Sequence, residues 1–404
     1  MAAQRQIATT RKHKPRKTDK TAPLRVLAIE MPVGMTDPIL EQAGKAGWIL
    51  SMSRYYHGTS ARQCIEWWGA DGVLVGPAAD DAPHDYWDDC PVPVVHVSGW
   101  VAARNAIIPD CRAAGRMAAE HLIEHGFRRL VYLMMGAQEY VMGQREGFLS
   151  AAAAAGIDAV SVDWYDKWRE FGEGPPGLRR FLAHTLAAMG PPVGLMVDED
   201  WTALEAVEAC REEGLEVPDR VAIVGVGNSP TICVNARVPL SSVDLNYGEM
   251  ARQAITILAD RMAGKNIPPG RVAVAPRGLV ARRSSDILAA DHPQVAKAIR
   301  FMWDRYADAG VGTPQVVAAT SLSRTALTRA FKQCLGRTIT KVLLDLRLRH
   351  ARELLATTPL KVLQVASRCG FADANSLRGV LRRQSGAGPR AWRHQQQDGA
   401  AAPD

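Results

Sequence analysis

Short apolar runs alternate with amphipathic stretches from residue 24 to residue 285. Continuous apolar runs of this length are typical of parallel strands that are covered on both faces. Such runs stand at 24–30, 47–53, 71–78, 92–98, 128–135, 193–198 and 221–227, and a longer strand-like stretch stands at 271–285. Repeated strand-helix units predict two doubly wound α/β lobes, whose ligands are expected at the carboxyl ends of the strands.

Amphipathic segments with helical spacing separate these runs. The stretch from Cys111 to His125 places its small and apolar residues on one face, and Gly126 is expected to end the helix. Further helices are expected at about 144–155, 201–213 and 247–262. The first half of the chain is therefore predicted to be α/β throughout.

The pattern becomes helical beyond residue 290, and it contains two similar helical pairs. In the first, residues 314–320 form a short helix and Ser323 caps a second helix that ends at Gly336. In the second, residues 362–369 and 372–384 flank a turn at Gly370 and Phe371. A single pair is equally typical of a generic helical hairpin, but two in series predict two helix-turn-helix units.

The second helix of each unit presents a polar outward face that could enter a major groove. Amide side chains pair with adenine and guanidinium groups pair with guanine, whereas the remaining basic side chains suit phosphates. The base-contact candidates are Arg324, Thr325, Thr328, Arg329, Ala374, Asn375, Ser376 and Arg378. The phosphate-contact candidates are Lys332, Arg337, Arg382 and Arg383. A leucine-rich helix at 341–358 is expected to hold the two units apart, because recognition helices must meet grooves about 34 Å from each other.

Charge is distributed very unevenly along the chain. Residues 291–395 hold 18 Lys and Arg residues against six Asp and Glu residues, whereas residues 21–290 hold 24 against 33. An excess of basic residues in one domain is the electrostatic footprint of phosphate binding. The charge therefore supports double-stranded DNA as the partner of the helical region.

The chain of 404 residues divides into four parts on these grounds. We expect a disordered basic tail at 1–23, a two-lobed effector-binding domain at 24–285, an all-α DNA-binding domain at 286–395 and a disordered tail at 396–404. The sequence shows neither a membrane span nor a signal peptide, which favours a cytoplasmic protein. The seven scattered cysteines are expected to be reduced, and no metal site or cofactor is expected.

The helical region resembles the DNA-binding domain of the AraC/XylS family. The resemblance rests on VVAATSLSRTALTRAFKQCLG at 316–336, RLRHARELLATTPLKVLQVASRCGF at 347–371 and LRRQSGAGPRAWR at 381–393. Gly386, Pro389 and Arg393 supply the closing motif of that family. Gly379 departs from it, since a long polar or basic residue is frequent there, and a helical glycine costs about 1 kcal/mol relative to alanine.

The α/β region resembles the LacI-type, periplasmic-binding-protein-like effector domain. The resemblance rests on residues 118–133, 143–157, 199–228 and 239–246, and its union with an AraC-type region is similar to the xylose-operon regulators. It implies a small polyhydroxylated ligand held between the lobes, with Arg145, Asp200 and Asn228 as the matching residues. Trp100, Trp164 or Trp201 could stack on a sugar ring, although core packing is the simpler reading of each.

We therefore expect a sequence-specific transcription regulator, an activator more than a repressor, that is controlled by a monosaccharide. The expected partners are promoter DNA, RNA polymerase and a second copy of the chain. Asn228 stands where the family often has Asp, so a constitutive regulator with a degenerate sensor is the alternative. An enzyme is disfavoured, because no nucleophile elbow, Walker loop or metalloprotease motif is found and no catalytic residue is assigned.

Overall fold

The structure, a computed structural model, describes residues 22–53, 61–76, 90–97, 106–268, 270–286, 292–386 and 388–398. These residues form two compact units: the first ends at Asp286, and the second comprises the residues after it together with the short segments Glu124–Phe127 and Pro218–Arg220. The first unit is α/β and the second is all-α, so the predicted fold class is confirmed. Most of the predicted N-terminal tail, through residue 21, lies outside the described residues, as does Trp100.

The first lobe of the α/β unit is built on a parallel sheet, called sheet A, in the order β11-β5-β4-β3-β1-β2. Its strands are β1 (Arg25–Ile29), β2 (Ile49–Ser53), β3 (Gly72–Val75), β4 (Val94–Val97), β5 (Ala106–Pro109) and β11 (Arg271–Val274). Helices α1 (Val33–Lys45) and α9 (Tyr247–Met262) pack in one apolar core on this sheet. Helix α2 (Ala61–Trp68) joins a separate core with β1 and β3.

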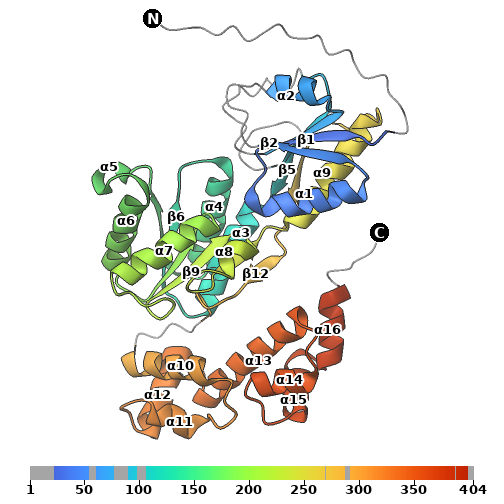
Figure 1. Ribbon diagram of the computed structural model, residues 1–404. Helices are drawn as coiled ribbons and strands as arrows, with labels where there is room; N and C mark the ends of the chain where they lie inside the picture. The colour runs from blue at the N-terminus through green and yellow to red at the C-terminus, as the bar shows by residue number, and fades with distance from the viewer. Residues whose placement is uncertain are drawn as a thin grey trace, which may run out of the picture. The chain divides into compact units, whose positions relative to one another are not determined.

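The second lobe is built on sheet B, in the order β12-β10-β9-β8-β6-β7. Its strands are β6 (Arg129–Met134), β7 (Asp158–Asp163), β8 (Val193–Val197), β9 (Val221–Val226), β10 (Ser241–Asp244) and β12 (Gly278–Val280), and β12 alone is antiparallel to its neighbour. Helices α5 (Trp168–Phe171), α6 (Gly174–Met189), α7 (Asp200–Glu212) and α8 (Pro230–Cys233) contribute to the main core of this lobe. Figure 1 shows helices α3 (Cys111–Glu124) and α4 (Glu139–Ala154) beside the same sheet.

Helices α3 and α4 approach each other backbone to backbone. A Cβ atom at Gly115 would collide with the carbonyl of Gln144, and one at Gly147 would collide with the carbonyl of Arg112. Glycine is required where two backbones come this close. The close contact fixes α4, whose N-terminal half faces the carboxyl ends of β6 and β8 through Gln144.

The chain crosses between the lobes three times. The crossings run from β5 to α3, from β10 to α9 and from β11 to β12. In two of them a side chain orders the connection: Asp110 accepts a hydrogen bond from Ala113 N at 2.9 Å, and Arg277 donates to Asn246 Oδ1 at 3.2 Å. Asn246 has a φ of 63°, in the left-handed region that asparagine tolerates.

Three strands, β5, β7 and β10, were not among the predicted apolar runs. The reason is clearest for β10, because two of its four residues are serines. The hydroxyls of Ser241 and Ser242 are buried but hydrogen-bonded, to Arg282 O at 2.8 Å and to Asp200 Oδ1 at 2.6 Å. Strand β7 lies at the edge of sheet B and alternates exposed with half-buried positions, so it lacks the continuous apolar run of a central strand.

The all-α unit contains seven helices in its described part (Figure 1). They are α10 (Pro293–Arg305), α11 (Thr313–Ala318), α12 (Arg324–Leu335), α13 (Ile339–Thr357), α14 (Val362–Arg368), α15 (Ala374–Ser385) and α16 (Pro389–Asp398). Helices α13, α14 and α15 share one apolar core. Helix α16 continues three residues past the predicted domain end at residue 395.

Within the described residues none of the seven cysteines forms a disulfide bond, and five of them are buried. Burial raises the pKa of the Cys111 and Cys210 thiols to about 12, so both stay protonated and pack as small apolar groups. Within the described residues, no helix combines the length and the apolar character needed to cross a membrane.

Candidate DNA-binding and effector sites

The first helix-turn-helix unit consists of α11 and α12. The Ser323 hydroxyl accepts a hydrogen bond from Ala326 N at 3.3 Å and caps α12, and Gly336 ends the helix in the left-handed conformation, as predicted. Leu327, Ala330 and Phe331 are buried on the inner face of α12. These three positions have the i, i+3, i+4 spacing of a helix that packs on one face.

The outer face of α12 carries the candidate DNA contacts of the first unit. Arg324, Thr325, Arg329 and Lys332 are exposed. Thr328 is half-buried, and its hydroxyl donates to Arg324 O at 2.8 Å, which leaves its methyl group as the more available contact. Arg337 follows the helix, and its Nη1 lies 4.0 Å from Asp345 Oδ2.

The second unit consists of α14 and α15, joined by a tight turn. Gly370 adopts a φ of 70°, and a Cβ atom there would collide with the carbonyl of Tyr306 and lie 2.7 Å from Arg347 Nε. Asp373 caps α15 by accepting from Ser376 N at 2.7 Å. Glycine at this turn is thus required twice, by its backbone conformation and by its neighbours.

Candidate DNA contacts gather on the outer face of α15 as well. Four residues around this helix, Phe371, Leu377, Val380 and Leu381, are buried. Ala374 is half-buried, and the other candidates are exposed, namely Asn375, Ser376, Arg378, Arg382 and Arg383. The Arg378 guanidinium donates to Asn375 Oδ1 at 3.0 Å, so these two side chains act as a pair.

Arg347 on the linking helix α13 stabilises the chain segment between α10 and α11. Its guanidinium donates to three carbonyls, those of Tyr306 at 2.9 Å, Asp308 at 2.8 Å and Val311 at 2.9 Å. The Tyr306 ring stacks on His350 with centroids 4.2 Å apart. Because Gly370 also packs on Tyr306, the same segment contacts both units.

Polar groups of the α/β unit gather at the carboxyl ends of three adjacent strands of sheet B. We call this set the strand-end cluster, and it consists of Asp198, Glu199 and Asp200 after β8, Asn228 after β9 and Asp244 at the end of β10, together with Arg282, which follows the antiparallel β12 and reaches Asn228 with its guanidinium. The predicted pair Asp200 and Asn228 belongs to it. The Ser242 hydroxyl lies between these two, donating to Asp200 Oδ1 at 2.6 Å and accepting from Asn228 N at 2.9 Å.

Protein groups already engage both predicted members of this cluster. Asp200 is buried, and its second oxygen accepts from Ser229 N at 2.8 Å. Asn228 accepts from Arg282 at 2.8 Å and donates to Asp244 at 3.3 Å. Their hydrogen bonds order the loop after β9, which places Asn228 at a φ of 51°.

Arg145, the third predicted ligand residue, lies on α4 and is not part of the strand-end cluster. Its Nε donates to Ser161 Oγ in β7 at 2.8 Å. The neighbouring Gln144 is buried and reaches the end of β8, where it donates to Asp198 O at 3.3 Å and accepts from Tyr132 at 3.0 Å. On a helix, consecutive residues point about 100° apart, so only one of the two can face the strand ends.

Sequence reasoning missed four members of the cluster, Asp198, Glu199, Asp244 and Arg282, and Asp198 is the most deeply buried of these four. It is 2% exposed, Oδ2 accepts from Met135 N at 3.2 Å, and Oδ1 has no hydrogen-bond partner among the described residues. Burial, and then the negative charge of Glu199, raises the pKa of this carboxyl to about 7. Its position directly after an apolar run was the available signal.

The neighbouring acidic groups also show raised pKa values. Burial raises the pKa of Glu199, and the charge of Asp200 raises it further. Burial likewise raises the pKa of Asp200, against hydrogen bonds from Ser242 and Ser229 that lower it. Perturbed titration of several groups at one sheet edge is typical of a ligand site.

Two of the tryptophans considered for stacking on a sugar differ clearly in their exposure. Trp164 is 5% exposed and packs on Phe181 with ring centroids 5.7 Å apart, so it is a core residue. Trp201 follows Asp200 and is 55% exposed. Its ring adjoins the cluster in sequence and is accessible for stacking.

Comparison with known proteins matches both units. Residues 119–285 match the periplasmic binding protein-like domain family, and residues 316–395 match a helix-turn-helix domain family. The xylose operon regulatory protein of Escherichia coli (strain K12) is 25% identical over 346 residues, which cover 81% of this chain and 85% of the relative.

Solved structures show the same fold. The structure of the xylose-binding transcription activator xylR covers 93% of this chain and 99% of its own chain, with a TM-score of 0.63 and 20% identity. The cellobiose complex of the transcriptional regulator CelR covers 64% of this chain and 84% of its own, with a TM-score of 0.53 and 22% identity. These relatives are transcription regulators and not enzymes. The chain is therefore an AraC-type DNA-binding transcription regulator that carries a periplasmic-binding-protein-like domain, with the domain organisation of the xylose operon regulatory proteins.

Proposed function

We propose that a monosaccharide binds at the strand-end cluster and controls the action of the two helix-turn-helix units on promoter DNA. The observation that carries this proposal is the cluster itself, because carboxylates, an amide and a guanidinium from adjacent strand ends suit the hydroxyls of a sugar. The exposed ring of Trp201 lies next to it in sequence. The xylose named for two relatives supports a pentose as the first ligand to test.

The ligand would act by favouring one arrangement of the two lobes. Three short crossings join the lobes, and two of them are ordered by single side chains, Asp110 and Arg277. A sugar changes DNA binding only if it binds the two arrangements unequally. Tyr247, at the start of α9, packs on Gly34 of α1 and is one of the groups that such a movement would involve.

Activation of transcription, with RNA polymerase and a second copy of the chain as partners, belongs to the same proposal. The word activator in the description of the structural relative supports it. Footprinting on the chain's own promoter, together with in vitro transcription with and without the sugar, tests the sign of regulation.

The ligand is tested by thermal shift and calorimetry on the full chain with pentoses, hexoses and their phosphates. A sugar at 100 times its Kd would stabilise the effector domain by about 2.7 kcal/mol. Glu199→Gln should weaken that response, whereas Glu213→Gln, the same change at the other end of α7, should leave it intact. Sugar binding that is identical in both variants would place the ligand elsewhere.

A constitutive regulator with a degenerate sensor is the second candidate. The observation that favours it is the engagement of Asp200 and Asn228 by protein groups. Under this alternative none of the sugars would shift the melting temperature of the wild-type chain, and DNA binding would be the same with and without them.

A further inference from the structure

A pocket of about 520 Å³ lies on the second helix-turn-helix unit, where α14, α15 and α16 meet. We call it the arginine pocket, and its lining is Val362, Arg378, Gly379, Arg382, Gly388, Pro389, Arg390 and Ala391. Three of these residues are arginines, and none of the eight is acidic. The pocket therefore carries a concentrated positive charge on the face of the recognition helix.

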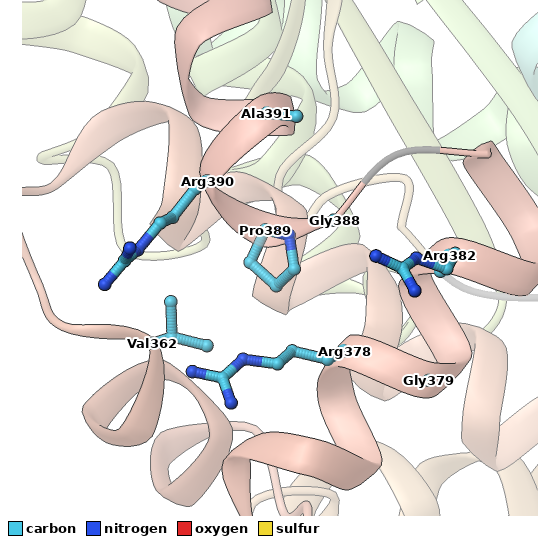
Figure 2. Close-up of a pocket in the computed structure, with 8 residues that line it drawn as sticks. All are labelled: Val362, Arg378, Gly379, Arg382, Gly388, Pro389, Arg390 and Ala391. Atoms are coloured by element: carbon cyan, nitrogen blue, oxygen red, sulfur yellow. The ribbon is translucent and has the colours of Figure 1, made fainter.

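The arginines surround the opening from two different helices (Figure 2). Arg378 and Arg390 extend to the same side, with Val362 between their guanidinium groups, and Arg382 lies near Gly388. Pro389 begins the ten-residue helix α16, so the free N–H groups of its first turn add partial positive charge at the same place. Guanidinium groups beside a helix N-terminus suit a phosphate.

Gly379 forms part of the wall, and nothing in the described protein requires a glycine there. It lies in the middle of α15, and its φ is outside the left-handed region. A Cβ atom added to it would meet only Arg383 Nη1, at 3.9 Å. Glycine at this position nevertheless lowers the stability of the helix by about a fivefold factor relative to alanine.

We propose that the arginine pocket receives a sugar-phosphate unit of the DNA backbone, and that Gly379 lets this unit approach α15 closely. Glycine in a regular helix that the fold does not need is expected where a backbone or ligand comes close. The proposal rests on DNA binding by this unit. It moves Arg378 from the base-reading candidates to the backbone contacts, and it adds Arg390, which sequence reasoning did not single out.

A phosphate contact and a base contact predict different results. A phosphate contact weakens binding equally on all sequences and reduces its salt dependence, whereas a base contact relaxes specificity at one position. Replacing Arg378 or Arg390 should therefore weaken binding to every DNA sequence by the same factor.

The experiment uses the full chain and a duplex that the wild-type chain selects from a random-sequence library. Affinity is measured by fluorescence anisotropy between about 50 and 200 mM KCl, a range over which each phosphate contact contributes about a threefold loss. Arg390→Gln and Arg378→Gln should each lower the salt slope by about one contact, and should weaken all single-base variants of the duplex by one common factor. Arg368→Gln, an exposed charge on the same unit outside the pocket, is the matched control.

The Gly379→Ala variant distinguishes a specific effect on DNA binding at the pocket from a general loss of folding. Alanine should raise the melting temperature, because it is the better helix former and meets open space, yet it should weaken DNA binding about fivefold or more if the backbone comes close. Equal or tighter DNA binding by Gly379→Ala would overturn the proposal. A sequence-dependent effect of Arg378→Gln would overturn it as well, in favour of base reading.

Further outcomes distinguish a failure of DNA binding as a whole from a failure of the pocket proposal alone. Wild-type chain that selects no duplex would refute DNA binding as a whole, whereas normal selection with unchanged variants would refute the pocket alone. Inorganic phosphate that raises the melting temperature of the wild type and not of Arg390→Gln, together with unchanged DNA binding by Arg390→Gln, would assign the pocket to a free anion and overturn the DNA contact.

Discussion

Replacing Asp198 by asparagine should change how the stability of the effector domain depends on pH. The side chain is 2% exposed, and its pKa of about 7 is raised chiefly by burial. An unfolded chain has an aspartate pKa of about 3.9. Between these two values the folded chain holds a proton that the unfolded chain has lost, so the free energy of unfolding falls as pH rises through this window.

The size of the effect follows from the shift. About three units correspond to at most about 4 kcal/mol, which is absent below pH ~4 and fully expressed above pH ~7. Asparagine cannot ionise and keeps an oxygen that accepts from Met135 N, the partner of Oδ2 at 3.2 Å. The stability of Asp198→Asn relative to the wild type should therefore rise from pH 5 to about pH 7 and level off above it.

Urea unfolding of the full chain, followed by tryptophan fluorescence at four pH values, measures this difference. Subtracting variant from wild type at each pH cancels the other titrating groups, including those that respond to the unfolding of the DNA-binding domain. Asp163→Asn is a suitable comparison, since this carboxylate caps the loop after β7 by accepting from Gly136 N and Tyr165 N. A difference for Asp198→Asn that stays constant from pH 5 to pH 8 would show that this carboxylate ionises normally.

The DNA-binding domain allows three shorter tests. Gly370→Ala should destabilise it by about 3 kcal/mol or more in urea unfolding, because the Cβ collides with Tyr306, whereas Gly336→Ala, with a similar φ and open space, should cost about 1 kcal/mol. An equal cost at both glycines would exclude the collision. Ser323→Ala removes the cap of α12 and should lower stability by about 1 kcal/mol, with Ser323→Asp as the variant that restores it. Arg329→Ala should weaken binding to the selected duplex by about 1–3 kcal/mol and relax specificity at one base position. A panel of single-base variants of the duplex measures both effects. A loss of affinity that is the same for all variants would assign Arg329 to a phosphate contact.

The sequence predicted the helix-turn-helix units well because their signals are local. Leu327, Ala330 and Phe331 follow helical spacing, and Ser323 and Gly336 mark the two helix ends within one short stretch. Each of these effects depends on residues only a few positions apart. Helix α12 and its inner face could therefore be located before any tertiary contact was known.

Features that depend on distant partners were not predictable in the same way. Arg347 has the composition of any basic helical residue, and its role appears only with the carbonyls about 40 positions earlier. The arginine pocket similarly needs Arg390 of α16 beside Arg378 of α15. In the α/β unit, Gln144 faces the end of β8, whereas its neighbour Arg145 contacts β7. A sequence motif does not reveal which of two consecutive helical residues faces the strand ends.

The way in which strand β12 leaves the α/β unit has a mechanical consequence. This strand pairs with β10, and the Ser284 hydroxyl that follows it donates to Ile223 O at 2.6 Å and accepts from Ser241 N at 2.8 Å. The covalent tether to the DNA-binding domain is thus anchored on sheet B. Along the chain, the first lobe is therefore joined to the DNA-binding domain only through sheet B.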